Sequence, residues 1–244
     1  PVVLDLMIHD IDAILSVVKS KVKNMIVVNN KLYVPTIPLT FQWTALTVDE
    51  LAEMPNMIAY NLADDTYEVV STFDRTFLGD NLNKMIMSTM SLGKNGEFII
   101  NHNFKDIFVI KDDQLSTYEA SFSGFSPETP VANGNMFDDM EEIMRIMNYV
   151  DSYESLRYLP QFDIYMRLAK FEESPADGMD LDRTFLHSKW ALIFLNDQFE
   201  KEGEIVLPQS ETNGNYIFET DEGIWFSTDH PDNPNLDEEK FQFR

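Results

Sequence analysis

Cysteine is absent from the 244-residue chain, and this absence excludes a disulfide framework, a thiolate nucleophile and zinc sites built on cysteine. Glycine is scarce, with nine residues, and neither the G-x-x-x-x-G-K-[ST] nor the G-x-G-x-x-G phosphate-binding pattern occurs. The G-x-S-x-G and H-E-x-x-H patterns of hydrolases and metalloproteases are also missing. The longest apolar run, 190–195, has six residues, whereas a bilayer-spanning helix needs about 20. These catalytic motifs are therefore absent from the sequence, and we expect a protein that is not embedded in a membrane.

Basic residues are few: 42 acids stand against 18 lysines and arginines, for a net charge of −24. Residues 1–122 hold 16 acids and 9 bases, and residues 123–244 hold 26 acids and 9 bases. Such a surface repels phosphate backbones and anionic lipid, which argues against direct binding of nucleic acid or membrane. The charge keeps a protein soluble, and it also suits a basic partner surface or the imitation of DNA.

Apolar residues at helical spacing predict several helices. The clearest covers 136–150, where Met136, Met140, Ile143 and Met147 repeat at spacings of four, three and four. Such a stripe fits either core packing or contact with a partner. Four further helices are expected over 4–22, 47–54, 80–92 and 182–201, and Thr47 with Glu50 has the spacing of a capping box at the start of the second of these. The last range contains a short apolar block that also fits a buried strand.

Short strands are predicted where β-branched and aromatic residues lie between turn residues. Two pairs flank the turns Asn29-Asn30 and Asp221-Glu222-Gly223 and are expected to form hairpins, and 161–168 alternates as a half-buried strand should. The expected strands cover 25–28, 31–34, 67–73, 97–100, 106–110, 117–122, 161–168, 216–218 and 224–226. Together these elements predict an α+β fold: short antiparallel strands and hairpins packed with four to five amphipathic helices.

The segment 124–135 contains two prolines and two glycines and is interpreted as a linker or loop. It separates an N-terminal α+β body, 1–123, from a C-terminal α+β body, 136–226, and the two could form one domain. An acidic tail, 227–244, follows. Such a polar end frays unless something holds it down, so we expect it to become ordered by docking on another molecule through Phe241 and Phe243. The expected partner-binding residues are Phe241, Phe243, Arg244, Met136, Met140 and Met147.

No residue pattern predicts a catalytic, cofactor or metal site. His9, His102 and His187 are isolated along the sequence, and the adjacent Ser188 points away from His187 if both lie in a helix. Acidic residues gather at 177–182 and 229–237. Neither group has the spacing of a calcium-binding loop, and both are interpreted as solvated loops. The first five residues contain an acid and no base, so we expect no secretory signal peptide there.

Residue usage adds one hint about function. The chain is rich in Asn, Asp, Phe and Met and poor in Ala and Gly, which resembles proteins of large DNA phages and viruses. The leading hypothesis is a non-enzymatic structural or assembly component of a virion (head, neck, tail or baseplate), located in the virion or the host cytoplasm. Its partners would be other protein subunits of the same assembly. One alternative is an acidic, DNA-mimicking inhibitor of a nucleic-acid-handling protein. The other is an enzyme in which His102 or His187 meets dispersed carboxylates in a cleft.

Overall fold

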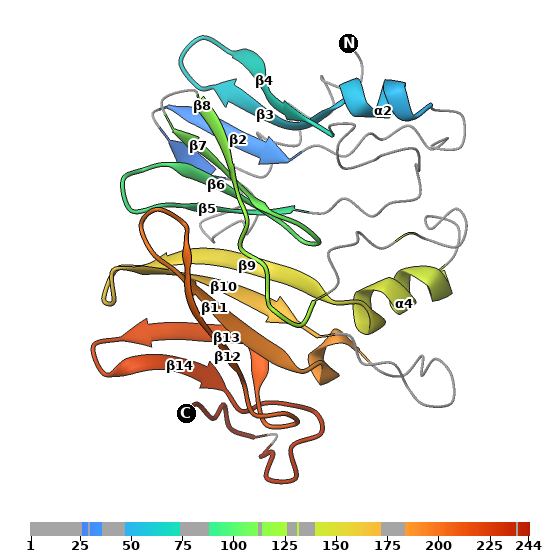
Figure 1. Cartoon of the computed structure of the whole chain (residues 1–244), viewed down its shortest axis with the longest axis vertical. Helices are drawn as coiled ribbons and strands as arrows, with labels where there is room; N and C mark the ends of the chain where they lie inside the picture. Colours follow the sequence, from blue (N-terminus) through green and yellow to red (C-terminus); the bar gives the residue numbers. More distant parts are fainter. Residues whose placement is uncertain are drawn as a thin grey trace.

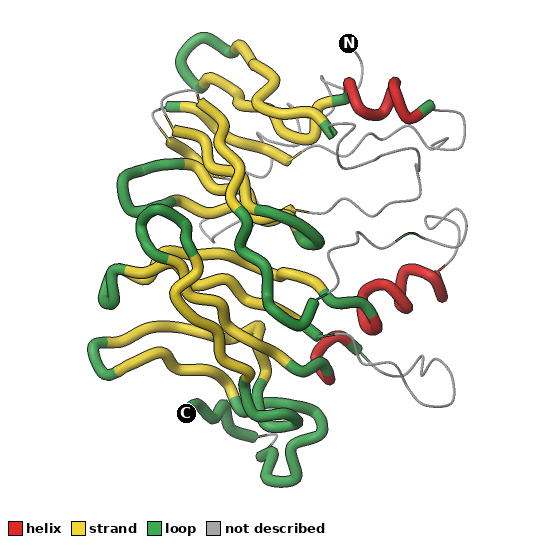
Figure 2. Tube along the Cα trace, in the orientation of Figure 1, coloured by secondary structure: helices red, strands yellow, loops and turns green. Residues whose placement is uncertain are grey.

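The computed structural model describes residues 26–28, 30–35, 47–73, 88–111, 114–125, 131, 140–171, 184–237 and 239–244. Within these residues the fold is nearly all antiparallel β-sheet, with two short helices (Figure 2). The helices are α2, Val48–Glu53, and α4, Met140–Tyr149, and a single 3-10 turn covers Phe185–His187. The expected α+β fold with four to five helices is therefore wrong.

The strands form four sheets, and in each sheet the spatial order of the strands is their order along the chain. The first sheet contains β1 Ile26–Val28, β2 Lys31–Pro35, β3 Pro55–Asn61 and β4 Thr66–Thr72. The second contains β5 Ser88–Leu92, β6 Phe98–His102, β7 Ile107–Lys111 and β8 Gln114–Tyr118. The third contains β9 Ser152–Leu159, β10 Ile164–Lys170, β11 Trp190–Leu195 and β12 Lys201–Val206. The last contains β13 Asn213–Thr220 and β14 Gly223–Ser227.

The sheets follow one another along the long axis of the molecule, from the blue and cyan first sheet to the red last sheet (Figure 1). Neighbouring sheets pack face to face as in a β-sandwich, and β5 lies against both β1 and β9, so the first strands of these sheets are neighbours. Four-stranded meanders stacked in this way are also the plan of β-propeller blades. Buried clusters join successive sheets and include Met57 with Phe98, Ile99 with Ile193, and Leu192 with Ile217.

Local signals predicted several elements correctly. The hairpin β1–β2 has Asn30 in its turn at φ 64°, and the hairpin β13–β14 turns at Asp221 and Glu222, between the paired residues Thr220 and Gly223. Helix α2 begins with the expected capping box: Thr47 Oγ1 accepts from the Glu50 amide at 3.2 Å, and the Thr47 amide donates to Glu50 Oε2 at 2.8 Å. The helix expected over 136–150 is present over Met140–Tyr149, and residues 136–139 lie outside the described residues.

The helix expected over 182–201 is wrong, and the alternative of a buried strand is confirmed. Trp190–Leu195 forms β11, which pairs with β10 on one side and β12 on the other. Five of its six residues are buried, so no polar alternation marked the strand. Part of another expected helix is also strand, because Ser88–Leu92 forms β5; residues 80–87 and the expected helix 4–22 lie outside the described residues. Residues 124, 125 and 131 are the described part of the expected linker, and sheets on either side of it share one buried cluster.

Candidate functional site

The C-terminal residues pair with the last sheet of their own chain. The Phe226 and Arg244 amides each donate to the other residue's carbonyl at 3.1 Å, and the Thr228 amide donates to the Gln242 carbonyl at 2.9 Å. An antiparallel bridge joins Ser227 to Phe243. The expectation that another molecule must order this end is wrong, because β14 supplies the backbone partners.

This pairing places the terminal phenylalanines on one side of the last sheet. Alternate residues of a strand point to opposite faces. Ile217 of β13 and Phe226 of β14 contact the third sheet, whereas their sequence neighbours Phe218 and Trp225, which are paired in register, point to the opposite side. We call the side chains on that side the aromatic face: Tyr216, Phe218, Trp225, Phe241 and Phe243.

Four rings of the aromatic face contact one another in two pairs and remain accessible to solvent. The Phe218 and Phe243 centroids lie 4.9 Å apart at 71°, and the Tyr216 and Phe241 centroids lie 6.2 Å apart at 76°, both in the edge-to-face arrangement that aromatic pairs favour. Exposure remains at 73% for Phe241, 50% for Tyr216, 43% for Phe218 and 37% for Phe243. A group of this size on one sheet face is typical of a surface that another molecule covers.

The six residues predicted to bind a partner have different positions. Phe241, Phe243 and Arg244 come together at the last sheet, where Arg244 Nη1 lies 2.5 Å from Glu211 Oε2. Met136 and the side chains of Met140 and Met147 lie outside the described residues. Tyr216, Phe218 and Trp225 were not among the predicted residues, although strict alternation along the two predicted hairpin strands is the signal that could have found Phe218 and Trp225.

A buried arginine joins the second and third sheets. Arg167 Nε donates to Asn101 Oδ1 at 2.7 Å, Nη1 to the Ala120 carbonyl at 2.7 Å, and Nη2 to the carbonyls of His102 and Lys105 at 2.9 and 2.5 Å. The guanidinium carbon also lies 3.6 Å from the Tyr153 ring centroid. Burial lowers the pKa of Arg167 to about 9. These contacts connect chain segments distant in sequence and give Arg167 a structural role.

The histidines considered as catalytic candidates occupy separate places. His102 is buried, its Nδ1 accepts from the Phe104 amide at 3.2 Å, and burial lowers its pKa to about 3. His187 contacts Thr184 and lies with its ring centroid 6.4 Å from that of His230. In the described part of the chain, no three His, Asp or Glu side chains are grouped so that they could hold a metal ion. The acids of 177–182 and His9 lie outside the described residues.

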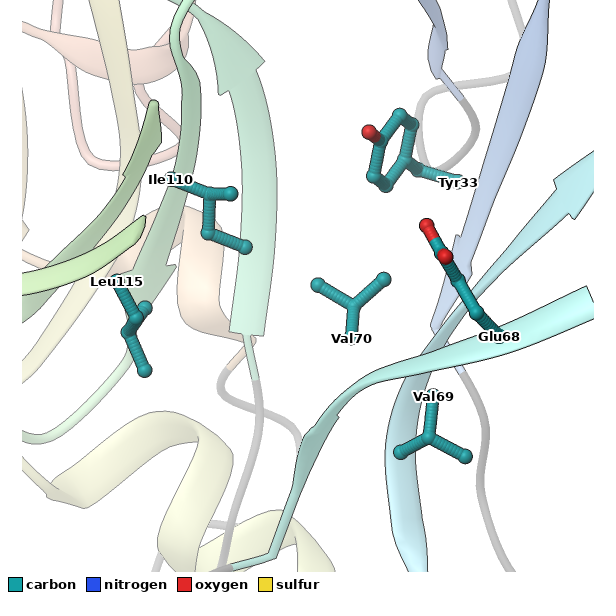
Figure 3. Close-up of a pocket in the computed structure, with 6 residues that line it drawn as sticks. All are labelled: Tyr33, Glu68, Val69, Val70, Ile110 and Leu115. Carbon is teal, nitrogen blue, oxygen red and sulfur yellow. The ribbon is translucent and has the colours of Figure 1, made fainter. Parts of the chain in front are cut away.

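A shallow hollow of about 210 Å³ opens between the first and second sheets (Figure 3). Its lining residues are Tyr33, Glu68, Val69, Val70, Ile110 and Leu115. Lys31 Nζ lies 2.5 Å from Glu68 Oε1, so a cation of the chain itself already contacts the carboxylate of the hollow. This local charge pairing makes the hollow a weaker candidate for partner binding than the aromatic face.

Comparison with known proteins gives a likeness in fold. No family model and no curated protein matches the chain. A crystal structure of a member of the DUF4221 family from Bacteroides vulgatus is similar, with a TM-score of 0.73 and 16% sequence identity. The likeness covers 90% of this chain and 61% of that chain. At this level of identity the likeness supports the arrangement of the sheets in this chain and says nothing about its activity.

Among the described residues, no helix combines the length and apolar character needed to cross a bilayer.

Proposed function

We propose that this protein is a non-enzymatic structural or assembly component that binds another protein subunit through the aromatic face. The observation that supports the proposal is the grouping of exposed Tyr216, Phe218, Phe241 and Phe243 on the side of the last sheet that faces away from the core. Aromatic side chains contribute large contact areas at a low cost in conformational entropy, and they dominate the energetics of many interfaces.

The rest of the molecule fits the role of a rigid support. Fully buried Arg167 links the second and third sheets through backbone carbonyls of 102, 105 and 120. Hydrophobic clusters then connect the third sheet to the last one. A surface on such a stack is preorganised, and preorganisation reduces the entropic cost of association.

The finer parts of the proposal rest on residue usage. We propose that the complex is a phage or viral virion and that the protein is found in the virion or the host cytoplasm. The partners in this proposal are other subunits of the same assembly.

The mass of the native particle tests the assembly role. The full chain and its Phe241→Ser/Phe243→Ser variant would be produced in the cells that naturally contain it, and the particles measured by size exclusion with light scattering. The wild-type particle is expected to exceed the 28.3 kDa of the chain, and the double variant should approach that mass. Phe162→Ser is the matched control, because Phe162 is 43% exposed in the turn between β9 and β10, and it should leave the particle unchanged. A wild-type mass of one chain, or a particle indifferent to the double variant, refutes the proposal.

A further inference from the structure

The surroundings of the aromatic face are strongly acidic. Between residues 211 and 244 the sequence has nine acids and two bases. Both bases are already paired within the chain: Lys240 Nζ lies 2.8 Å from Asp237 Oδ2, and Arg244 Nη1 lies 2.5 Å from Glu211 Oε2. The stretch therefore carries a net charge of −7 (nine acids against two bases), and this charge favours a partner that brings positive charge to the face.

The rings themselves favour one kind of cation. The face of an aromatic ring is electronegative, and a planar guanidinium stacks on it while remaining free to bind carboxylates. An ammonium group is more strongly hydrated and stacks less well. The chain contains an example of this contact, because the Arg167 guanidinium lies 3.6 Å from the centroid of the Tyr153 ring.

From charge and ring chemistry together, we infer that the aromatic face binds a basic protein surface that presents arginine side chains. This inference rests on the proposed function and names the chemistry of the partner. A second copy of the chain is a poor occupant, because each copy carries a charge of −24 and like charges oppose association.

Trp225 supplies a direct readout of the aromatic face. The chain has three tryptophans: Trp43 lies outside the described residues, and Trp190 is buried at 1% exposure. Trp225 is opposite Phe218 in register and is partly exposed, with its Nε1 donating to Thr220 Oγ1 at 2.9 Å. A ligand on the aromatic face should change its emission, and Trp225→Phe identifies the contribution of this residue.

The probe is a capped peptide of alternating glycine and arginine with three arginines, titrated into the full chain. A lysine peptide of equal charge and a glutamate peptide serve as reference ligands. The arginine peptide should change Trp225 emission with saturation and bind about fivefold more tightly than the lysine peptide, as expected for a cation–π contribution of about 1 kcal/mol. Phe241→Ser/Phe243→Ser should weaken binding of the arginine peptide about tenfold, and Phe162→Ser should leave it unchanged. Added salt should weaken the binding.

Three outcomes overturn the inference. Equal binding of the arginine and lysine peptides, unaffected by the double variant, means general attraction to an acidic protein. Failure of the arginine peptide to bind, while the mass of the native particle still depends on Phe241 and Phe243, leaves the assembly role intact and removes the basic partner. Self-association that appears at high salt and is lost in the double variant identifies a second copy as the occupant.

Discussion

Aromatic side chains occur both at the contact between the second and third sheets and on the outer side of the last sheet. They are buried at the first place and exposed at the second. In the first, a Tyr153 ring is covered by the Arg167 guanidinium, which is fully buried and hydrogen bonded. In the second, the rings of the aromatic face lie at the surface, with exposures up to 73%. The contrast teaches that aromatic residues of this chain are expected to stabilise the fold most where another sheet covers them. Where no sheet covers them, we propose that they bind a partner.

The largest expected effect on stability concerns the buried contact between the second and third sheets. Arg167→Met removes the donors for Asn101 and for three buried carbonyls, and leaving such acceptors unpaired should lower the free energy of unfolding by about 3–5 kcal/mol. Chemical denaturation measures it. Lys31→Met is the control, because the pair of Lys31 with Glu68 is partly exposed and such a pair contributes about 1 kcal/mol or less. Equal losses of unfolding free energy for the two substitutions would mean that the buried contact contributes no more to stability than the partly exposed ion pair.

Acidification should weaken the same contact. Burial lowers the pKa of His102 to about 3 from 6.5, so the unfolded chain takes up the proton before the folded chain does. Stability supplied by the neutral imidazole is complete above pH 6.5 and is lost as the pH falls toward 3, with a slope of about 1.4 kcal/mol per pH unit. His102→Asn, whose Oδ1 can accept from the Phe104 amide, should show a shallower slope in denaturation experiments at pH 4–7. Parallel slopes for the two proteins would contradict this assignment.

Gly214, at the junction of the third and last sheets, and Gly203, on β12, offer a matched pair of glycines. A Cβ at Gly214 would lie 2.4 Å from the Trp190 ring, whereas a Cβ at Gly203 would meet nothing within 4 Å. Gly214→Ala should therefore destabilise the chain by about 1–3 kcal/mol through overpacking. Gly203→Ala should be near neutral or slightly stabilising. Thermal unfolding of both variants decides the matter, and a harmless Gly214→Ala would mean that this junction is loose.

Features that depend on a few neighbouring residues could be predicted from the sequence, whereas features that depend on contacts between distant parts of the chain could not. Turn residues and a capping box predicted hairpins and α2, because these signals act over a few positions. The alternation of 161–168 indicated a strand with one wet face, yet Arg167 on that strand is fully buried. Its acceptors lie 47–66 residues away, so no local pattern could reveal them. For the aromatic face, the sequence predicted that Phe241 and Phe243 dock on another molecule, and only the fold showed that their segment pairs with β14 of the same chain.

The smallest expected effect on stability is at the aromatic face. Phe241 is 73% exposed, so Phe241→Ser should lower the free energy of unfolding of the isolated chain by less than about 1 kcal/mol. Phe98, which is 3% exposed between the first and second sheets, is the matched buried residue, and Phe98→Ser should cost about 3–5 kcal/mol. Denaturation of the two variants measures the contrast. A large loss for Phe241→Ser would mean that its ring maintains the last sheet, and the aromatic face would then be part of the core and not a surface available to a partner.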